Sequence, residues 1–88
     1  MTPSSDVLAA HLAGEAVLLN LSDKSYYRLN ETAAFVWSSI EAGNSRDSIL
    51  AALLKSYNAP ETTISRQLDE ILAEFFERKL ITDLVSDS

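Results

Sequence analysis

The sequence contains no cysteine, one histidine, two glycines and two prolines among its 88 residues. Without cysteine, the chain can form no disulfide, no thiolate metal site and no thiol nucleophile. Two glycines, Gly14 and Gly43, are too few for a glycine-rich phosphate-binding loop. The single histidine, His11, has no acidic residue within three positions, so it lacks the neighbours of a general base or a metal ligand. We therefore predict a protein without enzymatic activity, cofactor or bound metal.

Basic residues are also scarce, because 7 Lys and Arg stand against 13 Asp and Glu, which gives a net charge of −6. A surface of this sign repels the phosphate backbone and argues against nucleic-acid binding. No apolar run approaches the ~18 residues that a membrane-spanning helix needs. The first six residues carry none of the Lys or Arg expected of a signal peptide. The composition predicts a cytoplasmic domain that binds neither nucleic acid nor membrane.

Hydrophobic residues make up 47% of the chain, which is enough for one modest core. We expect a single domain over residues 1–88 with its core between about residues 7 and 81. Residues 2–6 and 86–88 are polar and are predicted to be frayed tails.

The first thirty residues contain short apolar runs separated by turn-forming residues. In the third run, Tyr27 and Leu29 would point to one face of a strand while Tyr26 and Arg28 point to the other. Breaks of hairpin length at residues 14–15 and 22–25 predict an antiparallel meander. The first run also fits a helix, because it contains two consecutive alanines. The three predicted strands are Val7–Leu12, Ala16–Leu21 and Tyr26–Leu29.

From Asn30 onward, the apolar residues recur at helical spacing. Asn30 is expected to cap a first helix that Gly43 ends, and Ser45 is expected to cap a second helix that stops at residues 58–60. A third helix is expected to begin at Pro60 or Glu61 and to run to about Lys79. Strands followed by helices predict an α+β fold, with the helices against one sheet face in a winged helix-turn-helix-like arrangement.

Two features of the third helix bear on function. Glu70, Glu74 and Glu77 follow i, i+4, i+7 spacing and are expected to form a solvated polar face rather than a catalytic site. Phe75 and Phe76 are adjacent, so they point about 100° apart, and we expect one in the core and the other at its margin. The apolar stripe is wider than a small sheet needs. Beside an open edge of the last strand, it would form a groove that accepts an extended peptide by strand addition.

The stretch Val17–Ala33, with its motif Tyr-Tyr-x-Leu-Asn-Glu-Thr, resembles the PqqD-like domains, which are the RiPP recognition elements of ribosomal peptide biosynthesis. Val36-Trp37 matches a further feature of these domains, and the resemblance extends from about residue 7 to residue 81. The family commonly has Gly where Ala33 and Lys79 stand. The chain also lacks the Pro-Glu of strict pyrroloquinoline-quinone pathway members. The resemblance therefore points to a stand-alone element of another pathway, such as the split B protein of a lasso-peptide system.

The resemblance implies that the leader segment of a precursor peptide adds as a further strand to the third strand and lies against the third helix. It implies a non-catalytic element that presents the precursor to a leader peptidase or another modifying enzyme. We expect this element to be a monomer or a weak dimer. An alternative is an acidic winged-helix domain that dimerises or docks on a partner protein through its surplus apolar surface. The implied peptide-binding residues are Tyr26, Tyr27, Arg28 and Leu29 on the strand, and Ile64, Gln67, Leu68, Ile71 and Phe75 on the helix.

Overall fold

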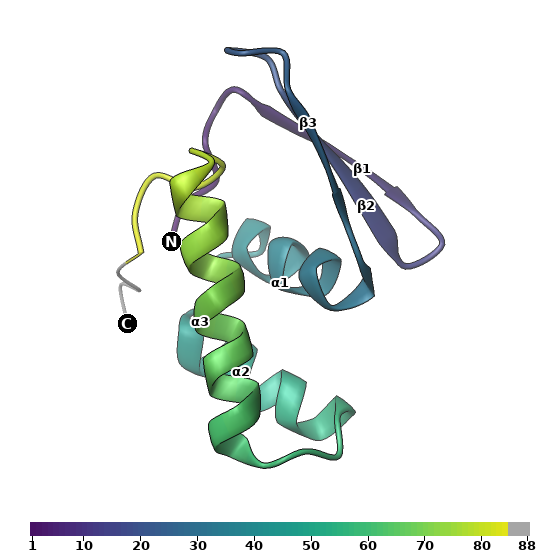
Figure 1. Ribbon diagram of the computed structural model, residues 1–88, viewed down its shortest axis with the longest axis vertical. Helices are drawn as coiled ribbons and strands as arrows, with labels where there is room; N and C mark the ends of the chain where they lie inside the picture. Colours follow the sequence, from purple (N-terminus) through teal and green to yellow (C-terminus); the bar gives the residue numbers. More distant parts are fainter. Residues whose placement is uncertain (85–88) are drawn as a thin grey trace.

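A computed structural model describes residues 1–84 of the chain. Its elements are β1 (Val7–Leu12), β2 (Glu15–Asn20), β3 (Tyr26–Leu29), α1 (Glu31–Glu41), α2 (Arg46–Ser56) and α3 (Glu61–Glu77). The strands form an antiparallel sheet in the order β1-β2-β3, and the helices lie on one side of it (Figure 1). The predicted α+β fold of three strands followed by three helices is confirmed, and the run at residues 7–12 is a strand rather than a helix.

A two-residue turn joins β1 to β2, where Leu12 pairs with Glu15. The intervening Ala13 and Gly14 both have positive φ, 50° and 84°, as a type I′ turn requires. The turn therefore lies one residue earlier than the break expected at residues 14–15. Glu15 is already the first residue of β2, because the type I′ geometry brings the strands into register at once.

The connection from β2 to β3 is held by the carboxylate of Asp23. This carboxylate accepts hydrogen bonds from the backbone N–H of Ser25 at 2.9 Å and from its hydroxyl at 2.5 Å. These two bonds hold the pKa of Asp23 below its usual value. The N–H of Asn20 then donates to the carbonyl of Ser25 at 2.8 Å, so the ladder between β2 and β3 begins immediately before Tyr26.

Side chains alternate between the two faces of the sheet as the sequence predicts. Ala16, Leu18 and Leu29 are buried beneath the helices, whereas Tyr26 and Arg28 are exposed on the opposite face. The buried face packs on α1 and α3, where the rings of Trp37 and Phe75 meet edge to face with centroids 5.5 Å apart. The side chains that are nearly excluded from solvent are Trp37, Leu18, Ile40, Ile49, Leu68, Leu80 and Val36.

The predicted helix caps are confirmed. The side chain of Asn30 accepts from the N–H of Ala33 at 2.9 Å, and that of Ser45 accepts from the N–H of Ser48 at 3.2 Å. Gly43, with φ of 84°, follows the last turn of α1. These caps fix where α1 starts and ends, and therefore how the chain leaves β3.

The helix α3 ends at Glu77, two residues before the predicted end at Lys79. The N–H of Lys79 donates to the carbonyl of Phe76 at 3.0 Å, and the N–H of Leu80 donates to the carbonyl of Phe75 at 2.9 Å. This is the Schellman pattern, whose C′ residue is left-handed and is usually glycine. Lys79 has φ of 59° and occupies that position, so the end of α3 carries backbone strain.

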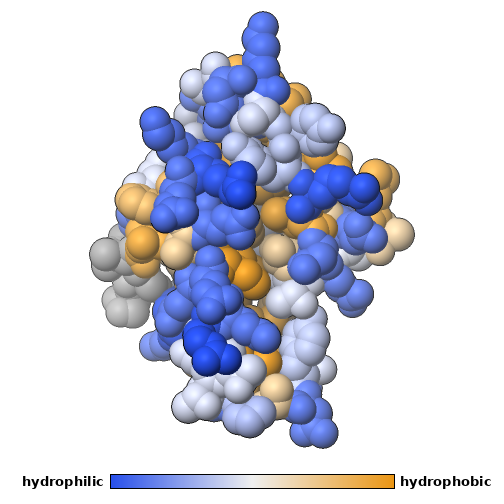
Figure 2. Space-filling model, viewed as in Figure 1, coloured by the Kyte–Doolittle hydropathy of each residue, from blue (hydrophilic) through white to orange (hydrophobic). Residues whose placement is uncertain are grey.

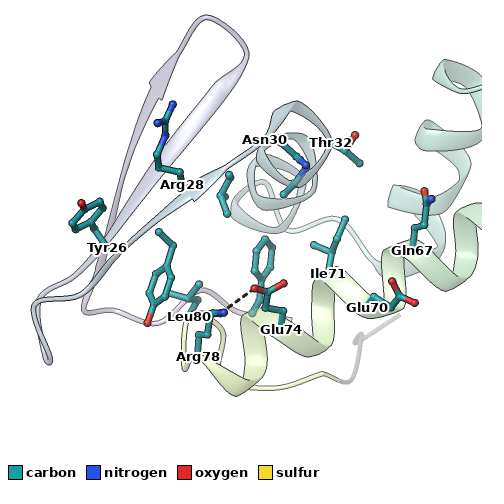
Figure 3. Close-up of a pocket in the computed structure, with 14 residues that line it drawn as sticks. Tyr26, Arg28, Asn30, Thr32, Gln67, Glu70, Ile71, Glu74, Arg78 and Leu80 are labelled. Atoms are coloured by element: carbon teal, nitrogen blue, oxygen red, sulfur yellow. Dashed lines mark hydrogen bonds and ion pairs between the residues drawn. The ribbon is translucent and has the colours of Figure 1, made fainter.

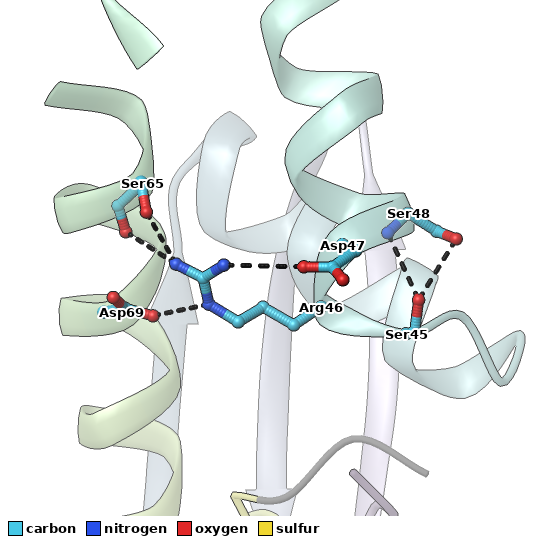
Figure 4. A network of polar contacts seen from close by, with 6 residues as sticks. All are labelled: Ser45, Arg46, Asp47, Ser48, Ser65 and Asp69. Carbon is cyan, nitrogen blue, oxygen red and sulfur yellow. Dashed lines mark hydrogen bonds and ion pairs between the residues drawn. The ribbon is translucent and has the colours of Figure 1, made fainter. Parts of the chain in front are cut away.

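Arg46, the first residue of α2, ties this helix to α3 (Figure 4). Its Nε donates to Asp69 Oδ1 at 2.7 Å, and its Nη2 donates to Ser65 Oγ at 2.7 Å. The bond to the Asp69 carboxylate raises the pKa of Arg46, which stays charged. A planar guanidinium that engages two partners on one helix restricts the orientation of α3.

The residues before β1 are not a frayed tail, so that prediction was wrong. Pro3 forms a β-bridge with Ile81, and the N–H of Ser4 donates to the carbonyl of Leu80 at 2.9 Å. The N–H of Thr82 also donates to the carbonyl of Thr2 at 2.9 Å. The two ends of the chain satisfy one another's backbone groups, which a local sequence pattern does not reveal. Residues 86–88, the other predicted tail, lie outside the described residues.

None of the helices in the described part of the chain combines the length and the hydrophobicity that crossing a bilayer requires.

Candidate functional site

The strand β3 has one open edge. Within residues 1–84 it pairs only with β2, as the last strand of the sheet. Because Asn20 bonds to Ser25 and the ladder alternates, the backbone N–H and C=O groups of Tyr27 and Leu29 point toward β2. Those of Tyr26 and Arg28 point toward the open edge. The predicted edge strand is confirmed.

A cleft of about 710 Å³ separates this edge from α3 (Figure 3). The strand β3 forms one wall, α3 forms the other, and the start of α1 closes one end. The lining residues are Tyr26, Tyr27, Arg28, Leu29, Asn30, Thr32, Ala33, Gln67, Glu70, Ile71, Glu74, Phe75, Arg78 and Leu80.

The bottom of the cleft is apolar. Phe75 and Leu29 are buried there with 3% and 7% of their surface exposed, and Ile71 and Tyr27 are half-buried. In the space-filling view, hydrophobic surface appears in the middle of this face between hydrophilic side chains on both sides (Figure 2). An apolar side chain of a ligand that bound at the bottom of the cleft would therefore be transferred from water to an apolar surface. This transfer would displace no buried polar group.

The rim of the cleft is polar and carries both charges. Arg78 Nε donates to Glu74 Oε1 at 3.0 Å, and the Arg78 guanidinium lies 5.0 Å from the centroid of the Tyr27 ring. The Tyr27 hydroxyl also forms a hydrogen bond with Ser25 Oγ at 3.0 Å. Tyr27 is thus held from both sides, which shapes the wall of the cleft. Glu70 stands exposed one helical turn before Glu74.

Seven of the nine residues implied by the resemblance line the cleft: Tyr26, Tyr27, Arg28, Leu29, Gln67, Ile71 and Phe75. Ile64 and Leu68 do not, because the row at positions 64, 68 and 72 of α3 faces the core, where Leu68 has no exposed surface. These two residues line a separate pit of about 30 Å³, which shares Thr32, Gln67 and Ile71 with the cleft. The pit has room for about one water molecule or one methyl group.

The cleft also contains residues that the sequence did not single out as part of a site. Glu70 and Glu74 were expected on a solvated face, but they line the cleft together with Arg78. On a helix, the row at positions 70, 74 and 78 lies next to the row at positions 67, 71 and 75. A prediction that the second row lines a groove therefore places the first row beside that groove as well. This spacing could have identified them.

The single histidine of the sequence lies away from the cleft. His11 is exposed on β1, with Nε2 at 3.6 Å from Glu41 Oε1, and does not line the cleft. Among residues 1–84, no group of three or more His, Asp or Glu side chains could hold a metal ion. An open backbone edge beside an apolar trough with a charged rim suits the binding of an extended chain.

Comparison with known proteins identifies the family. Residues 15–81 match the family model described as coenzyme PQQ synthesis protein D (PqqD). The chain belongs to the PqqD family. The matched residues contain all three helices, β2 and β3, and therefore the whole cleft of this PqqD-family protein. No curated protein matches it.

Two solved structures are similar to this PqqD-family chain over nearly its whole length. One is TbiB1 in complex with the TbiA(beta) leader peptide, which is 28% identical with a TM-score of 0.92 and covers 97% of this chain and 99% of its own. The other is a lasso peptide synthetase B1 complexed with the leader peptide, which is 21% identical with a TM-score of 0.84 and covers 92% of this chain and 95% of its own. The second likeness supports the fold alone.

Proposed function

We propose that this chain is a non-catalytic recognition element that binds the leader segment of a ribosomally made precursor peptide in the cleft between β3 and α3. The observation that carries the proposal is the open edge of β3 beside an apolar trough. TbiB1, 28% identical to this chain, is recorded in complex with a leader peptide. Family membership, the overall similarity of fold and the open edge of β3 support the same function here.

The proposed mechanism is strand addition. A peptide that runs along β3 would exchange backbone hydrogen bonds with Tyr26 and Arg28, whose N–H and C=O groups point into the open edge. Every second peptide side chain would then point toward Tyr27 and Ile71 at the bottom of the cleft. Backbone bonds supply affinity that does not depend on sequence, and the apolar trough selects side chains.

The rim adds a preference for charge. Glu70 is exposed on the α3 wall, whereas Glu74 is already paired with Arg78. A Lys or Arg of the peptide next to Glu70 would meet an unshared carboxylate on a chain whose net charge is −6. We infer that the preferred leader combines apolar residues with at least one basic residue.

We further propose that the bound precursor is presented to a separate leader peptidase or another modifying enzyme. The cleft of this chain combines an open backbone edge with an apolar trough, which suits binding. Binding is therefore the contribution that we assign to this chain, and the chemistry on the peptide is assigned to a second protein.

Isothermal titration calorimetry tests the proposal with two peptides: the leader of the precursor encoded beside the gene for this chain, and the TbiA(beta) leader. We expect micromolar or tighter affinity for a segment of about ten residues of the first peptide. Ile71→Glu should abolish binding, because it puts a charge at the bottom of the trough. Ala73→Glu, which adds the same charge to α3 outside the cleft, should bind normally. No binding by the wild-type chain, or equal binding by both variants, would contradict the proposal.

A further inference from the structure

The strand β1 is the other outer strand of the sheet, and its outer edge is open. Among residues 1–84 it pairs only with β2. The N–H of Leu21 donates to the carbonyl of Asp6 at 2.8 Å, where the ladder between the two strands begins. Because this ladder alternates, the backbone groups of the even-numbered residues of β1 point toward β2. Those of the odd-numbered residues point to the open edge.

This edge lacks the features that usually keep strand edges from pairing. Charged side chains, prolines and bulges are the common protections of an edge strand. The strand β1 reads Val-Leu-Ala-Ala-His-Leu and contains no Asp, Glu, Lys, Arg or Pro. Its six residues pair with β2 without a bulge, and four of them are exposed. On a chain of net charge −6, β1 is therefore an uncharged edge that a further strand can approach.

Hydrogen bonding within the chain leaves a defined set of donors on this edge. The N–H of Val7 already donates to the carbonyl of Ser4 at 3.2 Å. The donors that remain are the N–H groups of Ala9 and His11, with the carbonyl groups of the same residues beside them. An antiparallel strand in which Ala9 faces His11 of a second copy uses every one of these groups. Each copy then donates two hydrogen bonds and accepts two.

The side chains fit the same register. It places a two-fold axis beside Ala10, which faces Ala10 of the second copy. Leu8 then faces Leu12 of the second copy, on the side of the sheet that points away from the helices. These leucines are 55% and 68% exposed in the single chain. They meet at non-hydrogen-bonded positions, where opposite side chains approach most closely and apolar pairs stabilise a sheet. The edge is therefore complementary to a copy of itself.

We propose that β1 pairs with β1 of a second copy, so that the sheets of two chains join into one antiparallel sheet. The strand order becomes β3-β2-β1-β1-β2-β3, and both β3 edges stay open at the outer ends. The two clefts then lie at opposite ends of the joined sheet. The pairing itself is independent of the proposed function. Its consequence, a dimer that holds two precursor peptides at once, rests on that function.

The contact is short, which sets the expected strength of the dimer. Five paired residues at ~3.3 Å rise make a contact about 17 Å long. An edge contact of this length falls below the about 800 Å² that each partner buries in a standard interface. We therefore expect a reversible dimer with a dissociation constant on the order of 100 µM.

Sedimentation velocity of the full chain, from about 10 µM to about 1 mM, tests the pairing across this range. The sedimentation coefficient of the wild type should rise with concentration. Ala9→Pro removes an outward N–H, which an edge strand tolerates, and takes away two of the hydrogen bonds between the copies. It should weaken dimerisation at least about tenfold. Ala9→Ser keeps the N–H and should dimerise like the wild type. Calorimetry should give both variants the same affinity for the leader.

A second pair of variants covers the case in which proline unfolds the strand. Leu8→Lys/Leu12→Lys places like charges opposite one another across the two-fold axis and should abolish the dimer, although it brings the net charge of the chain closer to zero. Leu21→Lys/Phe76→Lys makes the same change of charge at apolar residues outside β1 that are 50% and 43% exposed. This control should still dimerise.

Three results would overturn the proposal. One is a wild-type chain that stays monomeric up to about 1 mM, well above the expected dissociation constant. Another is a dimer that persists in both Ala9→Pro and Leu8→Lys/Leu12→Lys. The third is a dimer that saturating leader peptide dissociates, because such a dimer would pair through β3. A wild-type chain that dimerises as expected but does not bind the leader would instead count against the proposed function.

Discussion

Arg28→Pro tests strand addition at the level of a single backbone group. Proline lacks the N–H, and the alternating ladder directs the N–H of Arg28 to the open edge rather than to β2. Proline is tolerated at edge positions whose N–H faces away from the sheet. We therefore expect Arg28→Pro to keep the hairpin between β2 and β3 and to lose one hydrogen bond to the peptide.

The expected loss of peptide affinity follows from the peptide carbonyl that is left without a hydrogen-bond donor. A peptide carbonyl that loses its donor on binding costs ~1–3 kcal/mol, which corresponds to a loss of about 5- to 150-fold in affinity. Arg28→Ala is the matched control because it keeps the N–H. The side chains of Arg28 and Glu15 are 75% and 57% exposed, and an ion pair this exposed contributes at most ~1 kcal/mol of free energy. Arg28→Ala should therefore lose no more than about fivefold in affinity for the peptide.

Tyr27→Pro provides the contrast. The N–H of Tyr27 faces β2, so proline at this position removes a hydrogen bond of the sheet rather than a hydrogen bond to the peptide. Tyr27→Pro should therefore lower the melting temperature, whereas Arg28→Pro should lower peptide affinity. Calorimetry and thermal unfolding of the three variants separate the two effects. A folded Arg28→Pro variant that binds the leader as tightly as Arg28→Ala would refute the strand-addition model.

Three further predictions concern stability and the division between core and cleft. Lys79→Gly should raise the free energy of unfolding by ~1 kcal/mol, because it relieves a left-handed residue at the end of α3, and urea unfolding measures this gain. Leu68→Ala should cost ~2–5 kcal/mol of stability as a core truncation, whereas Ile71→Ala should cost less stability and weaken leader binding in calorimetry. Asp23→Ala should destabilise the chain at pH 7. Because the folded pKa of Asp23 is lowered, its contribution is present above about pH 4 and is lost as the pH falls further, so unfolding curves of the two proteins should converge in acid.

Each of these predictions has a clear contrary outcome. A Lys79→Gly variant no more stable than the wild type would mean that the left-handed conformation carries no strain. Equal stability losses for Leu68→Ala and Ile71→Ala would contradict the assignment of these residues to the core and the cleft. A stability difference at Asp23 that persists well below pH 4 would show that the carboxylate charge is not what holds the turn.

Local sequence patterns were sufficient for most of the fold. Alternation predicted the opposite faces of Tyr26 and Tyr27, because side chains in a strand have a period of two. The caps at Asn30 and Gly43 followed from side-chain and backbone chemistry that acts within four residues. The adjacent pair at residues 75 and 76 divided as expected, with Phe75 buried and its neighbour 43% exposed.

The parts that escaped prediction depend on contacts between distant segments. The pairing of Pro3 with Ile81 joins residues far apart in the chain, and no short-range signal marks it. Whether Ile64, Leu68 or Ile71 faced the cleft depended on how α3 is rotated against the sheet. The clamp from Arg46 restricts this rotation from another helix. Hydrophobic periodicity gives the apolar side of a helix but not the division of that side between core and groove.

Amide hydrogen exchange followed by NMR tests the central claim most directly, with and without saturating leader peptide. Strand addition at β3 predicts that the amides of Tyr26 and Arg28 become strongly protected on binding. The amides of Ala9 and His11, which point to the opposite edge of the sheet at β1, should exchange at unchanged rates. Unchanged exchange at Tyr26 and Arg28 in the saturated complex, or protection that appears at the β1 edge instead, would contradict it.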